Sequence, residues 1–418
     1  MCVTEKLVAP KPTLNKCSET LSSNNGTKPQ TLSSSSEAVI NLDQGDPTVY
    51  ESFWGKAGEK CTMVIKGNEL MSYISDLRKP CWFLEEELEN TIKRLHRVAG
   101  NAVVDDRYVV VGTGSTQLYQ AVLYALTTGG TAPDQQPVPV VCAAPYYSQY
   151  ADETDFLRSG LYKWAGDAYA FDKEGPYIEV VTSPNNPDGT TREAVVISSP
   201  ADQGKVLYDL AYYWPQYTPI TRAADYDIMY FTFSKSTGHA GSRIGWALVK
   251  DEEIARKMTK FIELSSIGVS KDSQLRAAKI MGVICDGYQD FKSDENSENF
   301  FEYAHQLMAD RWKRLREVVA RSNVFSLPKY PQEYCLFHGE FTESFPAFAW
   351  LKSKEGAIDE DCEKFLRESY KIVGRGGRRF GADPSYARLS MLSREEVFQQ
   401  FLDRLQSINN GTVSNGNY

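Results

Sequence analysis

Lys235, at the end of an apolar run, is the residue of this sequence most suited to covalent chemistry. The run Tyr230-Phe-Thr-Phe-Ser-Lys235 has the composition of a buried strand, and a loop with Gly238 and Gly241 follows it. Burial disfavours the charged ammonium form of a lysine, so the amine becomes a usable nucleophile. Such an amine can form a Schiff base with an aldehyde cofactor, for example pyridoxal phosphate. Because most lysines simply reach solvent, the rest of the chain has to supply the other parts of such a site.

A strand end and a turn offer partners for the ring of such a cofactor. Asp209 ends the apolar run that begins at 205, where its carboxylate can pair with a protonated pyridine nitrogen and make the ring an electron acceptor. Tyr212 can hydrogen-bond the ring hydroxyl, and so can Asn186 within Ser183-Pro-Asn-Asn-Pro-Asp-Gly. Each residue alone also fits an ordinary turn or cap, so only their combination is informative.

A candidate phosphate site lies in Gly112-Thr-Gly-Ser115-Thr116-Gln117, between a predicted strand and a predicted helix. The third glycine of a dinucleotide fingerprint is missing, which argues against that interpretation. Backbone N–H groups and the hydroxyls of Ser115 and Thr116 at a helix N-terminus can still bind phosphate, although both residues could be helix caps alone. Arg243 can add a bidentate contact and Thr232 a hydroxyl.

Arg388 is the candidate for binding a substrate carboxylate. It lies in Tyr386-Ala-Arg388-Leu-Ser-Met391, far along the chain from the other candidates. The planar guanidinium matches a carboxylate in bidentate geometry. The alternative is that Arg388 is an ordinary exposed surface charge.

Composition favours small-molecule chemistry over nucleic acid or membrane binding. The 418 residues are 42% hydrophobic, enough for a sizeable core, and the net charge of -9 suits neither nucleic acid nor an anionic membrane. The 8 cysteines include no CxxC pair and no metal-ligand spacing, so we expect reduced thiols and no metal site. No apolar run of signal-peptide or membrane-span length occurs before residue 40. We therefore expect a cytoplasmic protein.

Short apolar strands alternating with helices and polar loops indicate an α/β fold. We predict strands over 107–111, 138–142, 177–181, 205–207, 228–233 and 245–249, with helices over 82–98 and 117–126. This alternation is typical of a mainly parallel central sheet flanked by helices, with functional residues at the strand ends. A charged helix over 303–322 and strands over 345–351 and 387–391 predict a smaller α+β domain. The expected organisation is a disordered Ser/Thr-rich tail (1–38), an N-terminal segment with the large domain (39–300), the small C-terminal domain (301–410) and a second disordered tail (411–418).

The order of these residues resembles the fold type I pyridoxal-phosphate aminotransferases. The residues that carry the resemblance are Ser115-Thr116, Ser-Pro-Asn-Asn186-Pro-Asp-Gly, Asp209-Leu-Ala-Tyr212, Ser234-Lys235 and Arg243. More narrowly, Asn41-Leu-Asp-Gln-Gly45-Asp-Pro-Thr, Leu70-Met-Ser-Tyr73 and Gly238-His-Ala-Gly-Ser-Arg243-Ile-Gly-Trp246 look like the plant tryptophan aminotransferases of the alliinase-related group. The resemblance covers roughly residues 39 to 405.

The resemblance implies a role for each matching position and a reaction. The implied catalytic residues are Lys235, as the Schiff-base lysine, with Asp209 and Tyr212; the cofactor, pyridoxal 5'-phosphate, would also be bound by Ser115, Thr116, Asn186, Thr232, Ser234 and Arg243. Arg388, with Gly45 near it, would hold the substrate carboxylate. Tyr147 would stack on the cofactor ring, with neighbouring Tyr146 as the alternative. Tyr73 would reach the phosphate of the partner subunit's cofactor, which implies a homodimer.

The implied substrates are an amino acid and a 2-oxo acid. By resemblance, L-tryptophan and pyruvate would give indole-3-pyruvate and L-alanine, in the synthesis of the auxin indole-3-acetic acid. Phe53 and Trp54 could form an apolar wall for an indole, or belong to the core. The alternative enzyme is a carbon–sulfur lyase acting on S-substituted cysteine sulfoxides, because alliinases share the cofactor block. Gly374-Arg375-Gly-Gly-Arg378-Arg379 resembles an RNA-binding segment, but a loop is the simpler interpretation in an acidic chain.

Overall fold

The computed structural model describes residues 38–128, 136–172, 174–197, 204–288, 299–358 and 361–410. The described helices and strands all lie between Ile40 and Asn410, within one compact unit that begins at Val39. The tails predicted at 1–38 and 411–418 lie outside the described residues, except for Ala38.

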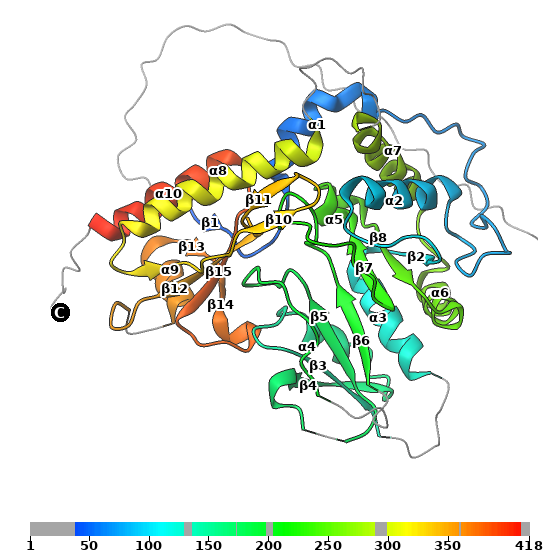
Figure 1. Ribbon diagram of the computed structural model, residues 1–418, viewed down its shortest axis with the longest axis horizontal. Helices are drawn as coiled ribbons and strands as arrows, with labels where there is room; N and C mark the ends of the chain where they lie inside the picture. The colour runs from blue at the N-terminus through cyan, green and yellow to red at the C-terminus, as the bar shows by residue number, and fades with distance from the viewer. Residues whose placement is uncertain are drawn as a thin grey trace, which may run out of the picture. The chain divides into compact units, whose positions relative to one another are not determined.

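A seven-stranded mixed sheet forms the centre of this unit (Figure 1). Its strands lie in the order β2-β8-β7-β6-β5-β3-β4; β8 runs antiparallel to both of its neighbours, and the other pairs are parallel. Every residue of β5, β7 and β8 is buried, which is typical of strands covered on both faces. The strands are β2 (Tyr108–Gly112), β3 (Val138–Cys142), β4 (Tyr162–Asp167), β5 (Ile178–Thr182), β6 (Lys205–Asp209), β7 (Ile228–Thr232) and β8 (Gly245–Val249).

The alternating directions of the residues along β8 show which helices cover each face of the sheet. Nε1 of Trp246 donates to His96 on α2 (Glu86–Ala99), whereas the neighbouring Gly245 packs on the first turn of α3 (Gly114–Thr127). Successive residues of a strand point to opposite faces, so α2 and α3 lie on opposite sides. Helix α7 (Lys271–Gly287) packs on α2, and α6 (Glu252–Ser266) packs on α3. The short helices α4 (Tyr150–Asp155) and α5 (Phe233–Ser236) follow β3 and β7.

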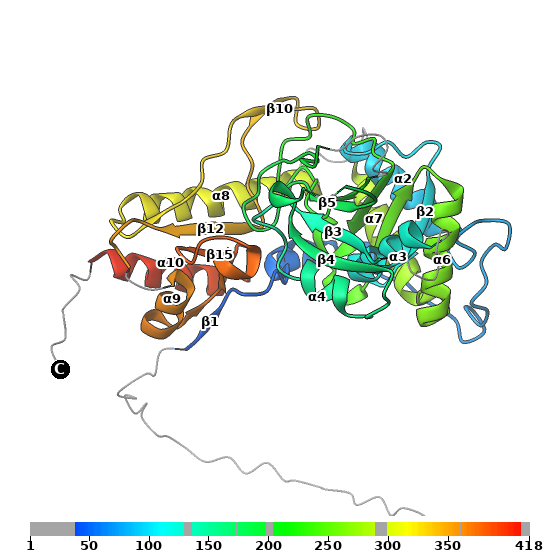
Figure 2. The same cartoon turned by 90° about the horizontal axis from the view of Figure 1, so that it is seen from below.

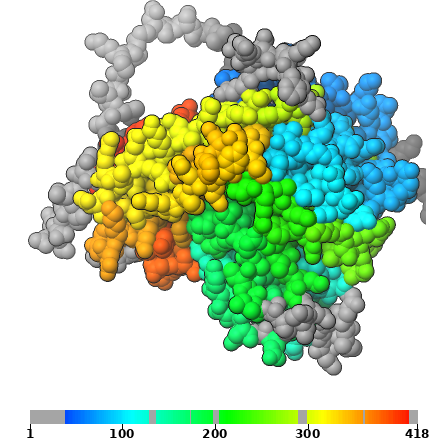
Figure 3. Space-filling model, in the orientation of Figure 1, coloured from blue at the N-terminus to red at the C-terminus, as the bar shows by residue number. Residues whose placement is uncertain are grey.

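The C-terminal part builds a separate four-stranded antiparallel sheet in the order β14-β15-β12-β9. Its strands are β9 (Phe325–Ser326), β12 (Phe348–Ser353), β14 (Arg375–Gly376) and β15 (Tyr386–Ser390), with α9 (Cys362–Tyr370) between β12 and β14. Helices α8 (Phe300–Ala320) and α10 (Glu395–Asn410) run side by side next to this sheet (Figure 1). A hairpin of β10 (Glu333–Cys335) and β11 (Glu340–Thr342) projects from this part in Figure 2. Figure 3 shows the yellow and orange C-terminal residues adjoining the cyan and green residues of the central sheet region on one face.

The first strand of the unit belongs to the C-terminal part. Strand β1 (Ile40–Asn41) pairs in parallel with β13 (Ile372–Val373), and the N–H of Ser390 donates to the carbonyl of Leu42 at 2.9 Å. The chain then continues into α1 (Glu51–Ala57). The position of residues 42–46 therefore depends on pairing between the two ends of the described chain. The 3-10 helices lie at Thr48–Tyr50, Gly58–Cys61, Ala168–Ala170, Ala240–Ser242 and Gly377–Phe380.

The predicted α/β class with a mainly parallel central sheet is confirmed. Strands β3 and β8 have the predicted bounds. Helix α2 begins at Glu86 instead of 82, because the N–H of Glu85 donates to the side chain of Gln274 in α7 (2.9 Å), which fixes the helix start from outside. The predicted domain boundary at 300 stays a prediction. None of the helices within the described ranges combines the length and the apolar character needed to cross a bilayer.

Candidate active site

A cavity of about 230 Å³ lies where β5, β6 and β7 end, and Phe348, Arg375 and Arg388 of the C-terminal part form its other wall. The carboxyl ends of parallel strands are the usual place for ligands in open α/β sheets. Ser234, Arg243 and Tyr73 are predicted site residues that do not line this cavity. Ten predicted residues do line it: Gly45, Ser115, Thr116, Tyr147, Asn186, Asp209, Tyr212, Thr232, Lys235 and Arg388.

Lys235 reaches the cavity from α5, a single turn that starts where β7 ends. The hydroxyl oxygen of Thr232 accepts a hydrogen bond from the N–H of Ser234 (3.2 Å) and caps this turn, so the strand end holds the lysine in place. Nζ of Lys235 donates to the carbonyl of Gly45. Burial, and the positive charges of Arg388 and Arg243, lower the pKa of Lys235 to about 8. A sizeable fraction of the amine is therefore uncharged in weakly alkaline solution.

Gly45 allows its backbone to approach this lysine. A Cβ added at Gly45 would lie 2.7 Å from Cζ of Phe348 and 3.1 Å from Nζ of Lys235. The first distance is shorter than real carbon contacts, so any side chain here must displace the ring. The segment that β1 positions thus closes the cavity over the lysine.

Asp209 is buried at the end of β6 and accepts three hydrogen bonds. Oδ2 accepts from the hydroxyls of Tyr150 (2.7 Å) and Tyr230 (2.9 Å), and Oδ1 accepts from the N–H of Ala211 (3.1 Å). Burial raises the pKa of Asp209, and these hydrogen bonds oppose that rise. No lysine or arginine of the described ranges forms an ion pair with Asp209. A carboxylate fixed in this way can pair with a cationic nitrogen of a ligand.

The predicted phosphate-binding turn forms the start of α3. Gly114 has a φ of 75°, and a Cβ added there would lie 2.5 Å from Nη2 of Arg243. The guanidinium of Arg243 therefore lies against the helix start, beside Ser115. The side chain of Gln117 accepts a hydrogen bond from the N–H of Thr113 (2.8 Å). The residue that breaks the dinucleotide fingerprint thus caps this helix.

Arg388 is a buried cation of the cavity. Nη1 donates to Oδ1 of Asn186 (3.0 Å), and Nη2 donates to the carbonyl of Asp43. The guanidinium carbon lies 4.0 Å from the ring centre of Phe348, and Nε has no partner among the described residues. Burial and the nearby charge of Arg375 lower the pKa of Arg388 to about 10. A buried guanidinium that is incompletely paired is suited to a carboxylate ligand.

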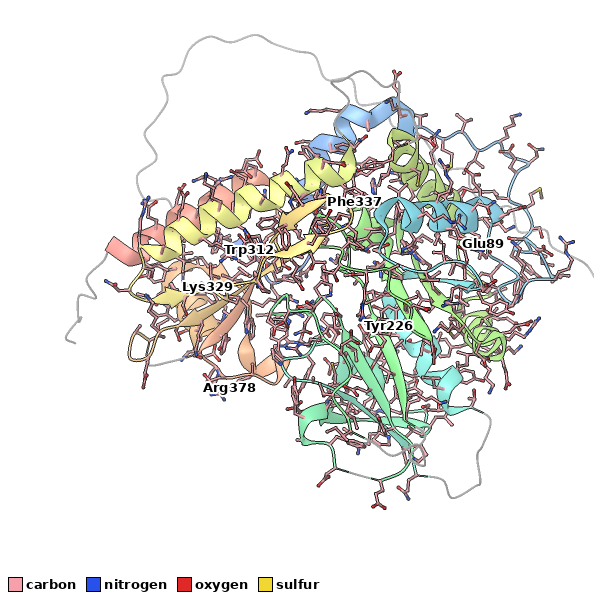
Figure 4. All side chains as sticks on the ribbon, viewed as in Figure 1. Glu89, Tyr226, Trp312, Lys329, Phe337 and Arg378 are labelled. Atoms are coloured by element: carbon pink, nitrogen blue, oxygen red, sulfur yellow. The ribbon has the colours of Figure 1, made fainter. Side chains whose placement is uncertain are left out.

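Arg375, which the sequence placed in an RNA-like run, lines the same cavity. It forms a bidentate ion pair with Asp43 (2.7 and 2.9 Å) and donates to Oγ of Ser148 (2.8 Å). Arg378 and Arg379 are exposed, and Figure 4 shows Arg378 on the periphery of the C-terminal elements. The three arginines therefore do not form one surface, and the first belongs to the cavity.

The structure separates the two tyrosines that the sequence could not. Tyr147 lines the cavity, and no described residue is a hydrogen-bond partner of its hydroxyl. Tyr146 packs edge-on against Trp164, with ring centres 5.1 Å apart. Tyr73 is 62% exposed and does not line the cavity of its own chain.

Phe53 and Trp54 are partly buried, pack against the core and do not line the cavity. Both rings contact Phe300 of α8, with ring centres 5.2 Å away in each case. Nε1 of Trp54 also donates to the carbonyl of Thr237 (2.8 Å). The structure therefore supports the alternative that these two aromatic residues belong to the core and do not form a wall for an indole.

Sequence reasoning missed several residues of the cavity, among them Tyr150, Glu153, Thr182, Tyr230 and Phe348. One signal was available, since Tyr230 and Thr232 are two positions apart on β7 and share a face. Tyr150 and Glu153 lie on α4, whose contact with β6 has no local signature in the sequence.

The chain matches the family model described as allinase over residues 40–409. It is 54% identical to tryptophan aminotransferase-related protein 1 of Oryza sativa subsp. japonica, over 89% of this chain and 84% of that protein. It is 54% identical to tryptophan aminotransferase-related protein 2 of Arabidopsis thaliana, over 90% and 83%. Identity to alliin lyase 1 of Allium sativum is 35%, over 88% and 74%.

The fold is also found in solved structures of distant sequence. The N-succinyldiaminopimelate aminotransferase of Mycobacterium tuberculosis superposes with a TM-score of 0.63 at 14% identity, over 88% of this chain and 93% of that chain. At this identity the likeness concerns the fold alone.

Proposed function

The chain belongs to the allinase family, whose enzymes depend on pyridoxal phosphate, and from this premise we propose that it transfers the amino group of L-tryptophan to pyruvate. The products would be indole-3-pyruvate and L-alanine. The observation that carries the proposal is the convergence of Lys235, Asp209 and Arg388 on one cavity.

The residues of the cavity fit pyridoxal phosphate. Asp209 is a buried carboxylate with no cation partner among the described residues, and it suits a protonated pyridine nitrogen. No described residue hydrogen-bonds the hydroxyl of Tyr212, which leaves it available to a ring oxygen. The N–H groups at the start of α3, with Ser115, Thr116 and Arg243, suit a phosphate.

Each protein group has a distinct task in amino transfer. Pyridoxal phosphate, when bound, supplies the electron sink for the bond that breaks at the substrate Cα. Lys235 takes up the Cα proton at Nζ, and its lowered pKa keeps part of the amine able to do so. Asp209 holds a proton at the ring nitrogen. Arg388 binds the substrate carboxylate and thereby orients Cα toward Nζ.

Tryptophan as the amino donor rests on the names of the relatives and on the aromatic lining of the cavity. Tyr147, Tyr212 and Phe348 line it together with Arg388, a combination that suits an aromatic amino acid. The purified protein, mixed with tryptophan and pyruvate, should form equal amounts of indole-3-pyruvate and alanine. A much higher kcat/KM with phenylalanine, tyrosine or methionine would contradict the assignment of the donor.

Lys235→Ala is the sharpest variant for the proposed reaction. It removes the proton acceptor, so turnover should fall by roughly 10²-fold or more, and the absorbance that depends on a covalent lysine link to the cofactor should disappear. Lys250→Ala is a matched control, since Lys250 pairs with Asp225 and Asp227 away from the cavity. Full turnover by Lys235→Ala would overturn the role of the lysine.

A carbon–sulfur lyase is the second candidate, because of the 35% identity to an alliin lyase. A lyase also removes the Cα proton but then expels a β-substituent, so no 2-oxo acid acceptor is consumed. Incubation with an S-alkyl cysteine sulfoxide separates the two functions. Pyruvate released without an acceptor, faster than tryptophan is transaminated, would favour the lyase.

The proposal includes a homodimer. Between residues 62 and 80 the chain forms a coil that exposes Val64 (82%), Met71 (85%) and Leu77 (71%). A second copy would cover this apolar surface and bring Tyr73 to the partner subunit's cofactor. Light scattering should give twice the chain mass of 47.0 kDa, and a monomer at micromolar concentration would refute this part of the proposal.

A cytoplasmic location and a role in auxin synthesis complete the proposal. The six described cysteines carry free thiols, and all except Cys61 are buried, which suits a reducing compartment. Imaging of a tagged chain tests the location. Loss of the gene should lower indole-3-acetic acid in the source plant, and an unchanged level would contradict the role.

A further inference from the structure

Glu153 carries a carboxyl group at the predicted phosphate site, and the proposed amino transfer does not use this group. It extends from α4 into the cavity that Ser115 and Thr116 also line. Its Oε1 accepts a hydrogen bond from the hydroxyl of Thr116, at the long distance of 3.4 Å. The side chain is half-buried, so it meets the cavity and not bulk water alone.

The surroundings of Glu153 are acidic or neutral. The ionisable groups that face it are Asp209 on β6, Tyr119 on α3, Tyr147 in the preceding loop and Asp152 on its own helix. No lysine or arginine in the described part of the chain pairs with it. Burial and the charge of Asp209 raise the pKa of Glu153 to about 7.

A phosphate bound at the start of α3 would share the cavity with this carboxyl. Two negative groups in one partly dry cavity repel each other strongly. A protonated carboxyl, in contrast, is a hydrogen-bond donor, and hydrogen bonds to a phosphate are charge-assisted. The phosphate therefore favours the protonated form of Glu153, and the ionised form disfavours the phosphate.

We propose that Glu153 is a cofactor-positioning residue that donates a hydrogen bond to the phosphate in its protonated form, so that cofactor binding is coupled to proton uptake at this carboxyl. The proposal rests on the use of pyridoxal phosphate. As pH rises from 6 to 9, Glu153 ionises in the free site, and affinity for the cofactor falls. A pKa that differs by one unit between the free and the bound state changes affinity tenfold, so we expect a loss of at least about tenfold.

The test measures cofactor dissociation from the holoenzyme by absorbance after equilibrium dialysis at pH 6, 7, 8 and 9. Glu153→Gln keeps a donor but cannot ionise. At pH 6 it should bind the cofactor about as tightly as the wild type does. Between pH 6 and pH 9 its fold-loss of affinity should be smaller than that of the wild type by a factor of at least about ten. Glu153→Leu has no donor, so it should bind roughly tenfold more weakly at pH 6 and show the same shallow pH dependence. Ionisation of Lys235 and of the phosphate affects all these proteins alike, so it cancels in the comparison.

Two controls isolate the carboxyl and the phosphate. Asp152→Asn removes an equal charge from the next position of α4, where the side chain is exposed, and should keep the pH dependence of the wild type. Pyridoxal, which has no phosphate, should bind wild type and Glu153→Gln with the same pH dependence. The proposal is overturned if the cofactor affinity of Glu153→Gln equals that of the wild type at every pH. It is also overturned if the two proteins differ in the pH dependence of their affinity for pyridoxal. A wild-type protein that binds no pyridoxal phosphate would refute the cofactor assignment, and this inference with it.

Discussion

Burial brings the pKa values of the two central groups of the cavity closer together. It lowers the pKa of Lys235 to about 8 and raises that of Asp209. The two residues differ in how they are held, because Asp209 accepts three hydrogen bonds while Nζ of Lys235 donates to one carbonyl. The carboxylate is thus fixed, and the amine can leave its partner and move a proton.

We expect Asp209→Asn to lower kcat by roughly 10²- to 10³-fold, the range seen when one fixed electrostatic partner is lost. The KM for tryptophan should change much less, because we propose that Arg388, and not Asp209, binds the substrate carboxylate. Steady-state kinetics of the purified variant provide the check. A variant with kcat within threefold of the wild type would show that the carboxylate has no electronic role.

Tyr230→Phe is the matched control for that prediction, since it keeps the carboxylate and removes one of its donors (2.9 Å). This hydrogen bond lowers the pKa of Asp209, so its loss raises that pKa further. We expect the acidic limb of the kcat profile to move to higher pH in Tyr230→Phe. A limb that stays in place or moves to lower pH would contradict the assigned hydrogen bond.

A methyl group at Gly45 should damage activity more than its size suggests. The added Cβ would lie 2.7 Å from Phe348 and 3.1 Å from Nζ of Lys235, and displacement of a catalytic group by about 1 Å can cost roughly 10²-fold. We expect Gly45→Ala to lose at least tenfold in kcat/KM by steady-state kinetics. Gly55→Ala is the control, because a Cβ there meets nothing within 4 Å. Equal kcat/KM in both variants would contradict the tight packing at Gly45.

Among the elements, a buried polar chain ties α2 to the loop that carries Tyr212. His96 accepts from Nε1 of Trp246 (2.9 Å), so its other ring nitrogen, 2.8 Å from Oδ1 of Asn101, is assigned as a donor. Nδ2 of Asn101 then donates to the carbonyl of Tyr213 (2.6 Å). The helix on one face of the sheet thereby fixes the backbone next to a residue of the cavity.

Asn101→Ala should lower the free energy of unfolding by about 2 to 6 kcal/mol. It leaves a buried donor on His96 and the carbonyl of Tyr213 unsatisfied, at about 1 to 3 kcal/mol each. Urea unfolding followed by circular dichroism gives the value. Asn323→Ala, at an exposed position of a bend, should change it by less than about 0.5 kcal/mol. A similarly small change in Asn101→Ala would show that the chain of hydrogen bonds contributes little.

The sequence predicts the helices and strands better than it predicts the contacts between them. Strands such as β3 stand out because their apolar runs are short and bounded by turns, and the order of motifs along the sequence predicts that Lys235, Asp209 and Arg388 share one site. The hydroxyl of Tyr150 on α4 reaches Asp209 at the end of β6, 59 positions away, and the start of α2 depends on Gln274. The ion pair of Arg375 joins it to Asp43, which is 332 positions away. Such long-range pairs leave no local pattern.

At the scale of the whole molecule, buried histidines make stability depend on pH. Burial lowers the pKa of His96, His239 and His305 from 6.5 to about 4 in the folded protein. Between pH 6.5 and 4 the unfolded chain therefore binds more protons than the folded one, and stability falls as pH falls. For His96, which is fully buried, this amounts to about 3 kcal/mol over the whole window. Glu153 acts in the opposite direction, because its folded pKa of about 7 lies above the value of 4.5 expected when unfolded.

We expect the free energy of unfolding to be lower at pH 5 than at pH 7 at constant ionic strength. Glu153→Gln should show a steeper loss, because it lacks a group whose raised pKa opposes that loss. Urea unfolding curves at the two pH values, with and without this substitution, provide the measurement. An equal or greater stability at pH 5 in the wild type would contradict this prediction.

The pairing of β1 with β13 has a consequence for how the enzyme is made. During translation, the residues that carry Lys235 and Asp209 leave the ribosome well before residues 372–373, on which β1 depends. Until then the carbonyl of Gly45 has no strand to hold it over the lysine, and neither Arg375 nor Arg388 exists. A nascent chain without residues 372–388 therefore lacks both the segment over Lys235 and the arginine that we propose for the substrate carboxylate, so we expect it to have no amino-transfer activity.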